Sequence, residues 1–442
     1  MMTNSAERLA QAGMSEFEAL RKAQLFDHVI RQLPSGDHDE VMQWFVPGRI
    51  EVLGKHTDYA GGRSLLCTAE RGFCVAASPR DDSLVQISDI VRQQNLQFTI
   101  SPDLEIPTSG WKVFPMVVAR RLARNFGGNV RGAEIAFASD LPSAAGMSSS
   151  SALLTAMFEV LCAVNQVSKR EEFKAAIQSV EDFAGYLGCI ENGQSYKSLQ
   201  GDSGVGTFGG SEDHTAILAS EPGHLKQYAF CRVRLERTVQ LPPDCVFVIA
   251  VSGVVADKTG AARARYNRAS EATRDILEIW RSQTGSAART LADVLSGGGD
   301  IADRVRYVLS RGGASAQWLG NRFEQFWRES EVIIPQACDA LARCDLKTFG
   351  VLVDQSQAAA EALLQNQVPE TIWLAKEARS LGAYAASAFG AGFGGSIWAL
   401  VRREDANKFA NGWRESYVAS PHPAAAKAEF FITAAGPPLT RV

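Results

Sequence analysis

The chain has 442 residues, with 45 lysines and arginines against 49 aspartates and glutamates, so its formal net charge is −4 with histidine neutral. This near-balance argues against a dedicated nucleic-acid-binding protein. Hydrophobic residues make up 46% and charged residues 21% of the chain, which excludes collagen-like and wholly disordered classes. At about 100–200 residues per domain, the length predicts two or three domains with a cleft between them.

Apolar segments and cysteines indicate a protein of the cytoplasm. The longest apolar runs, Cys245–Val251 and Ile397–Val401, are far shorter than the ~20 residues of a membrane span. The N-terminal segment lacks the basic and apolar regions of a secretory signal. No two of the eight cysteines have the spacing of a zinc or redox pair, which favours reduced thiols in the core. We therefore expect a cytoplasmic protein with no membrane span.

The first 140 residues mix short β-rich runs with one helical stretch, which predicts an α+β layer. The helical stretch is 111–124, and the predicted strands are 74–77, 84–87, 96–100 and 133–137. After Ser148, apolar residues at helical spacing predict a helix to about Val164, and a second helical pattern covers about 171–186.

A second domain is predicted to open at Cys245–Val251, which has the pattern of a buried strand. The stretch Ser282–Gly299 is rich in glycine and serine, which predicts a surface loop. The remaining predicted elements are helices near 269–281, 301–309 and 372–380 and strands at 397–401 and 428–433.

Three segments have compositions that suit chemistry, and the first is Pro47–Gly62. It gathers Arg49, Glu51, Lys55, His56 and Asp58 among four glycines. Ionisable groups beside flexible turns are typical of a polar binding loop. An exposed hairpin turn explains the same pattern equally well, and composition alone does not separate the two interpretations.

The second segment, Asp140–Ala152, is a small-residue loop between a predicted strand and a helix. Backbone N–H groups at a helix N-terminus favour an anion, small side chains let a polyphosphate approach, and serine hydroxyls reach its Mg²⁺. The loop is not a Walker A motif, because no Gly-Lys-Ser/Thr follows. The alternative is an ordinary serine N-cap after a linker, although four serines exceed what capping needs.

The third segment, Gly390–Ser396, is a glycine-rich run before the predicted strand 397–401. In a dinucleotide-binding fold the glycines follow the strand and open a helix, so this order excludes that interpretation. A tight turn that needs glycine for backbone reasons is the simpler explanation.

In this order, the three segments resemble the three signature motifs of the GHMP small-molecule kinases, and the first resembles the galactokinase signature. The resemblance implies a two-domain α+β fold, with domains at 1–235 and 236–442 and the active site in the cleft between them. It implies ATP- and Mg²⁺-dependent phosphorylation of the anomeric (C1) hydroxyl of galactose or a related monosaccharide.

Residue roles carry over from the family by position. Asp213 resembles the family's catalytic aspartate, which accepts or orients the proton of the sugar hydroxyl, and Arg49 resembles the arginine beside it. The positions that resemble sugar-binding residues are Lys55, His56, Asp58, Gly210 and Tyr266. Those that resemble ATP-binding residues are Trp111, Ser143, Ala145, Gly146, Met147, Ser148, Ser149 and Ser150.

For Mg²⁺, the family pairs a serine with a glutamate, which implies Ser149 with Glu191. Glu181 fits the usual spacing from the serines and is the alternative. Trp111 is equally well explained as a core residue. Monomer and homodimer both remain open, and the partners implied are a sugar and ATP, without nucleic acid.

Lys55 departs from the resemblance, because galactokinases have a glutamate here that contacts the sugar. A cation at this position would pair with an acidic sugar such as a uronic acid, unless Lys55 turns to solvent and galactose still binds. Other departures are the run Ser356–Ala360 and the length of the stretch from Ser150 to Asp213. L-Arabinose, N-acetylgalactosamine or a uronic acid as substrate, or a non-catalytic sugar sensor, are therefore the alternatives.

Overall fold

The structure, a computed structural model, describes residues 2–33, 41–127, 130–256 and 263–442. Its larger sheet has eight strands in the order β12-β1-β2-β5-β3-β4, with β6 paired to β2 and β7 paired to β6. All neighbours are antiparallel except β3 and β5. The strands are β1 (Met42–Leu53), β2 (Arg63–Pro79), β3 (Leu84–Asp89), β4 (Gln94–Thr99), β5 (Ala133–Ser139), β6 (His224–Ala229), β7 (Arg234–Gln240) and β12 (Thr440–Arg441).

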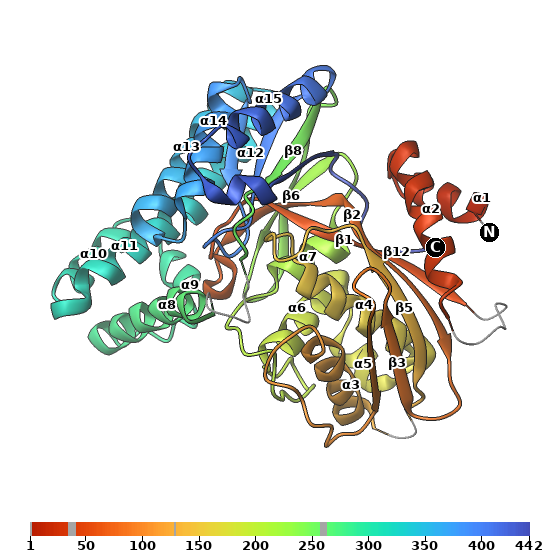
Figure 1. The fold of residues 1–442 in the computed structure, drawn as a ribbon. Helices are drawn as coiled ribbons and strands as arrows, with labels where there is room; N and C mark the ends of the chain where they lie inside the picture. The colour runs from red at the N-terminus through yellow and green to blue at the C-terminus, as the bar shows by residue number, and fades with distance from the viewer. Residues whose placement is uncertain (1, 34–40, 128–129, 257–262) are drawn as a thin grey trace.

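Helices cover both faces of this sheet (Figure 1). Along β2, Val75 and Ala77 join the core beneath α3 and α4, whereas Cys74 and Ala76 join the core beneath α1 and α2. This alternation follows from the two-residue period of a strand, and it explains why the run is apolar at every position. The helices are α1 (Met2–Gln11), α2 (Glu16–Ile30), α3 (Val113–Phe126), α4 (Ser149–Val164), α5 (Glu171–Ala176), α6 (Val180–Asn192) and α7 (Glu212–Ala219).

The smaller sheet has four antiparallel strands in the order β11-β8-β10-β9. Helices α14 and α15 pack on one face. On the other face, Phe247, Trp398 and Phe349 of α13 belong to the same apolar core as the larger sheet, so the two sheets share one core. The elements are β8 (Cys245–Val251), β9 (Ala385–Ala388), β10 (Ser396–Arg402), β11 (Glu429–Thr433), α12 (Ile334–Ala342), α13 (Leu346–Ala359), α14 (Pro369–Ser380) and α15 (Ala406–Val418).

A third group of helices projects beside the sheets, at the lower left of Figure 1. It has its own core, in which Ile276, Trp280 and Phe323 pack with Ala60 of the first segment. The helices are α8 (Arg263–Thr284), α9 (Leu291–Leu295), α10 (Ile301–Ser310) and α11 (Ala316–Trp327). Short 3-10 and π segments are Asp58–Ala60, Val167–Lys169, Gly313–Ser315, Arg328–Ile333, Ala360–Leu364, Arg403–Asp405 and Pro423–Lys427.

Most predicted elements are confirmed within a few residues, and β8 has the predicted bounds. Three predictions are wrong. The described part of the first 140 residues contains three α-helices rather than one, because α1 and α2 precede β1. The helical pattern over 171–186 is two helices, because Ser179 caps a new helix by accepting a hydrogen bond from the N–H of Asp182. The predicted loop Ser282–Gly299 contains α9, which begins with a capping box between Thr290 and Asp293.

The division at residues 235/236 stays a prediction. Strands β1–β7 belong to the larger sheet and β8–β11 to the smaller one, and β12 returns to the larger sheet. The α+β expectation is confirmed by the mixed helices and strands. No helix in the described ranges combines the length and apolar character that crossing a bilayer requires. All eight cysteines are free thiols.

Candidate active site

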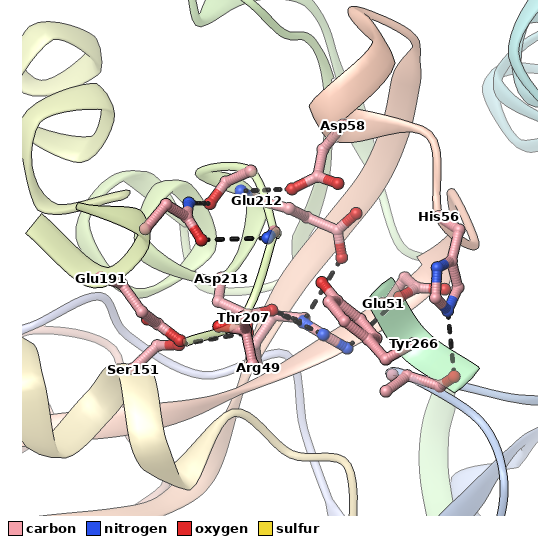
Figure 2. Close-up of a pocket in the computed structure, with 15 residues that line it drawn as sticks. Arg49, Glu51, His56, Asp58, Ser151, Glu191, Thr207, Glu212, Asp213 and Tyr266 are labelled. Atoms are coloured by element: carbon pink, nitrogen blue, oxygen red, sulfur yellow. Dashed lines mark hydrogen bonds and ion pairs between the residues drawn. The ribbon is translucent and has the colours of Figure 1, made fainter. Parts of the chain in front are cut away.

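A narrow cavity of about 40 Å³ lies where the first segment meets α4, α6, α7, α8 and the third segment. Its lining is mostly polar, and Figure 2 shows these side chains converging from separate elements. The lining residues are Arg49, Glu51, His56, Asp58, Ser151, Glu191, Asn192, Thr207, Gly209, Gly210, Glu212, Asp213, Tyr266, Gly390 and Ala391.

Arg49 and Asp213 form the central ion pair of the cavity. Arg49 lies on β1 with 2% exposure, so its orientation is fixed by the sheet. Asp213 lies in the first turn of α7. Arg49 donates to Asp213 Oδ1 from both Nε (2.8 Å) and Nη2 (2.6 Å). A fixed guanidinium thus holds one carboxylate oxygen, while Oδ2 faces Ser151 at 3.2 Å.

Two more carboxylates approach the same guanidinium (Figure 2). Glu212 Oε1 lies 3.5 Å from Arg49 Nε, and Glu51 Oε2 lies 3.6 Å from Nη1. Burial raises the pKa of Glu51 to about 7, and burial together with the charge of Glu51 raises the pKa of Glu212 well above its usual value. Burial alone would lower the pKa of Arg49, but Asp213, Glu212 and Glu51 raise it. The raised pKa values of Glu51 and Glu212 thus accompany the gathering of three carboxyl groups around one buried guanidinium.

Asp58, His56 and Tyr266 form the side of the cavity that the sequence assigns to the sugar. Asp58 Oδ2 accepts a hydrogen bond from the N–H of Glu212 at 3.2 Å, and a Cβ on Gly210 would lie 2.3 Å from the same oxygen. Glycine is therefore required at 210 by this close approach. The His56 ring lies 5.0 Å from the Tyr266 ring, and its Nε2 donates to the carbonyl of Ala391 at 3.0 Å.

Ser151 and Glu191 lie across the cavity from these groups (Figure 2). The Ser151 hydroxyl lies 2.8 Å from Glu191 Oε2. His214 Nε2 lies 2.9 Å from the same oxygen and His214 Nδ1 lies 3.1 Å from Thr155 Oγ1. Glu191 is thus held in one orientation beside Asp213, whereas Glu181 lines a different, larger cavity.

In the small-residue loop, Asp140–Ser148, three carbonyl groups are held by other parts of the chain. The carbonyls of Ala144, Ala145 and Met147 accept hydrogen bonds from Ala256 N–H, Ser396 Oγ and Arg49 N–H. Within the described ranges, no residue accepts a hydrogen bond from the N–H groups of 143–148. The Ser148 hydroxyl is buried without a partner among these residues. Free donors at the start of α4 fit a phosphate.

The third segment packs against this loop, with Gly390 next to Gly146. It connects β9 to β10, as the turn interpretation expected, and Gly390 has φ 77°. A Cβ on Gly390 would lie 2.7 Å from the carbonyl oxygen of Gly146. Glycine is therefore needed both for the left-handed backbone and for the contact with the phosphate-type loop.

The sugar contact of Lys55 stays a prediction, and the structure places this side chain in the interior. It is 1% exposed and lies outside the cavity lining. Its ammonium donates to Ser356 Oγ (3.1 Å) and Ser387 Oγ (2.8 Å) in the shared core between the sheets. The alternative that Lys55 turns to solvent is wrong, because the side chain is buried and donates two hydrogen bonds.

The remaining predicted residues occupy the loop and its surroundings. Ser149 and Ser150 begin α4 outside the cavity lining, and Ser143 accepts a hydrogen bond from Arg92 Nη2 at 2.8 Å. Trp111 packs edge-on to Phe137, with ring centres 6.1 Å apart, so its described contacts are those of a core residue.

Sequence reasoning gave no individual role to Glu51, Ser151, Thr207 or Glu212, which all line the cavity. Ser151 is the serine that faces Glu191, and it is the last of the four consecutive serines. Glu51 stands two positions after Arg49 on a strand and Glu212 directly precedes Asp213. The two-residue period of the strand is the signal that would have placed Glu51 beside Arg49.

The oxygen donors of the cavity fit a hard cation, because the Glu191 carboxylate and the Ser151 hydroxyl converge. In the described ranges, no group of three or more His, Cys, Asp and Glu side chains is placed to hold a metal ion.

Three family models match this chain. Residues 35–79 match the galactokinase galactose-binding signature, residues 114–190 the N-terminal domain of GHMP kinases, and residues 337–419 the GHMP kinase C-terminal region. A galactokinase of Roseiflexus sp. (strain RS-1) is 27% identical over 381 residues, covering 84% of this chain and 86% of the relative. A galactokinase of Chloroflexus aggregans is 28% identical over 376 residues, covering 82% and 84%.

Solved structures share the fold. Lactococcus lactis galactokinase, solved in complex with galactose, superposes with a TM-score of 0.71 at 21% identity, covering 92% of this chain and 96% of that one. Methanococcus jannaschii mevalonate kinase gives a TM-score of 0.52 at 11% identity, covering 92% and 100%.

Proposed function

Because the chain is a galactokinase-like member of the GHMP kinase superfamily, we propose that it transfers the γ-phosphoryl group of ATP to the anomeric hydroxyl of galactose or a close relative. The chain is an enzyme of the sugar kinase type. What we propose is which hydroxyl receives the phosphoryl group and which sugar carries it. The observation that carries it is the Asp213 carboxylate, which Arg49 holds on one oxygen and which faces Ser151, in the first turn of the helix that follows the small-residue loop, with the other.

Asp213 acts on the sugar hydroxyl. With Oδ1 bonded to Arg49, its Oδ2 is the oxygen directed toward Ser151 and the cavity. A sugar hydroxyl placed there donates to Oδ2, which orients the hydroxyl oxygen for in-line attack and takes its proton as the new bond forms. Phosphoryl transfer depends mainly on such positioning and on charge stabilisation.

Arg49 keeps the carboxylate in place and supplies positive charge at the reacting centre. Its charge is retained at all working pH values, since the pKa is raised above an already high value by the carboxylates around it. The three carboxylates also prevent the guanidinium from turning elsewhere, which preorganises the site.

ATP fits the loop 143–148 with its phosphates against the free N–H groups at the start of α4. A bound Mg²⁺ supplies neutralising charge on the phosphate oxygens. We propose Glu191 as its carboxylate ligand, and Ser151, rather than Ser149, as the hydroxyl that faces the same space.

The test is ATP consumption by the purified protein across neutral, N-acetylated and acidic hexoses and pentoses, with phosphorus NMR to locate the product phosphate. We expect galactose or a close neutral relative to give a 1-phosphate. Turnover of a different sugar class would replace the substrate assignment. Sugar and ATP binding without turnover would overturn the kinase proposal in favour of a sensor.

A further inference from the structure

Arg322 is a fully buried arginine on α11 that lines neither the catalytic cavity nor the larger cavity beside it. Its guanidinium donates to four uncharged acceptors: the carbonyls of His56 and Ala269, the side-chain amide of Gln325 and the hydroxyl of Tyr59. A buried guanidinium is stable only when its N–H groups find acceptors. These contacts therefore identify what Arg322 holds in place.

Two of the acceptors belong to the first segment, and a third belongs to α8. Nη2 donates to the His56 carbonyl and, at 3.1 Å, to the Tyr59 hydroxyl. Nε donates at 3.2 Å to the carbonyl of Ala269, which lies three positions after Tyr266 on α8. The rings of His56 and Tyr266, with centres 5.0 Å apart, both line the catalytic cavity (Figure 2). One guanidinium thus joins the two elements that carry these rings.

The backbone at His56 depends on the same helix. His56 has φ 59°, a left-handed conformation that residues other than glycine adopt rarely. The carbonyl of Lys55 accepts a hydrogen bond from Gln325 Nε2 at 3.0 Å, and the carbonyl of His56 accepts from Arg322. Helix α11 therefore holds both peptide groups that flank the strained residue, which is how such a conformation persists.

The Tyr59 hydroxyl extends the contact to the His56 ring. His56 Nδ1 lies 2.9 Å from this hydroxyl, and Nε2 lies 3.0 Å from the carbonyl oxygen of Ala391. A guanidinium only donates and a carbonyl only accepts. The Arg322 N–H therefore donates to the Tyr59 oxygen, the Tyr59 O–H donates to Nδ1, and Nε2–H donates to Ala391. Burial raises the pKa of Tyr59 to about 12, so the hydroxyl keeps the proton that it donates.

The direction of this hydrogen-bond chain sets the tautomer of His56. The ring carries its proton on Nε2 and keeps Nδ1 as an acceptor, and its plane is held at both nitrogen atoms. The chain ends in the third segment, where Ala391 follows Gly390, which packs against Gly146 of the small-residue loop. The His56 side of the cavity is thereby connected to the loop that the proposed function assigns to ATP.

We propose that Arg322 is a positioning residue for the sugar: through Tyr59 it holds His56 as the Nε2–H tautomer, and through α8 it keeps Tyr266 beside that ring. Arg322 itself lies outside the catalytic cavity. The inference rests on the proposed function, because it takes the His56 side of the cavity as the sugar side. Loss of the chain should weaken the use of sugar and leave the use of ATP in place.

The variants Tyr59→Phe and Arg322→Lys break the chain at two points. The first removes one hydroxyl and keeps the ring, and the second keeps the charge but loses the planar guanidinium. The matched controls are Tyr417→Phe and Arg328→Lys. Tyr417 is a fully buried tyrosine in the core of the smaller sheet whose hydroxyl donates to a backbone carbonyl. Arg328 is an exposed arginine six positions after Arg322.

Nitrogen-15 NMR of the six histidines reports the tautomer without turnover, and His56→Gln assigns the signals of His56. We expect a single Nε2–H tautomer of His56 in the parent and in both controls, and a mixture of tautomers in Tyr59→Phe and Arg322→Lys. In Tyr59→Phe the KM for galactose should rise about tenfold, the size expected for one lost hydrogen bond. The KM for ATP should stay within about twofold of the parent.

A single Nε2–H tautomer in Tyr59→Phe, or a KM for galactose that matches the controls, overturns the inference while galactose turnover still supports the kinase. Tyr59→Phe provides this test even where Arg322→Lys does not fold. A parent that transfers no phosphoryl group, in which Tyr59→Phe mixes the tautomers and weakens galactose binding by calorimetry, supports the positioning role and refutes the proposed function instead.

Discussion

Replacing Lys55 by methionine removes the buried ammonium but keeps an unbranched side chain, so the substitution tests the contribution of the ammonium to stability. Lys55 donates to Ser356 and Ser387, and Ser356 in turn donates to Glu329 Oε1 at 2.9 Å. Glu329 is fully buried and also accepts from the N–H of Gly54 at 2.8 Å. The ammonium is thus linked through one hydroxyl to a buried carboxylate that fixes the same loop.

The expected cost is large for a single substitution. Hydrogen bonds to a charged group contribute about 1.5–3 kcal/mol each, and removing one partner of a buried charge network costs about 3–5 kcal/mol. We expect Lys55→Met to lower the free energy of unfolding by about 3–5 kcal/mol. The unfolding entropy is about 2.1 cal/mol/K per residue. For 442 residues that unfold together, this energy cost therefore lowers Tm by about 3–5 °C.

Thermal unfolding of Lys55→Met, Glu329→Gln and the double variant tests this reasoning, with Lys376→Met, an exposed lysine on α14, as control. The double variant should recover part of the loss, because a neutral amide no longer needs the ammonium. The preference between galactose and galacturonic acid should stay within about twofold of the parent. An unchanged Tm with a tenfold change in that preference would refute the buried role and place Lys55 in the sugar site.

Three further substitutions probe the site. Asp213→Ala should lower kcat by about 10²–10⁴ while calorimetry finds ATP affinity within about twofold; near-normal turnover would show that the carboxylate is misassigned. Gly210→Ala would place a Cβ 2.3 Å from Asp58 Oδ2. The KM for sugar should therefore rise roughly tenfold, with little change in the KM for ATP. An unchanged KM for sugar would contradict the close approach. Burial raises the pKa of Glu51 to about 7. Between the usual pKa of 4.5 and this value, the folded state binds a proton that the unfolded state has released. The stabilisation from this proton is therefore present at low pH and is lost as the pH rises through about 7. The Tm of the parent minus that of Glu51→Gln should therefore fall between pH 5 and 8, and parallel curves would contradict the raised pKa.

The sequence alone predicted features that are coded locally. The strand Cys245–Val251 is apolar at nearly every position, and the structure gives it the predicted bounds. The loop before α4 is made of small residues, and within the described ranges the N–H groups of 143–148 have no acceptor. Arg49 and Asp213 are 164 positions apart. Without the structure, only their positions in the motifs that resemble the family predicted that they lie together.

Tertiary structure decided what depends on distant partners. The partners of Lys55 are 301 and 332 positions away, so no local pattern distinguishes a sugar contact, a solvent-exposed lysine and a buried one. The choice of Glu191 over Glu181 beside Asp213 follows from how α6 packs against α4 and α7. A strand or loop in the sequence fixes which side chains share a face, but the packing of elements far apart in the chain fixes what those side chains meet.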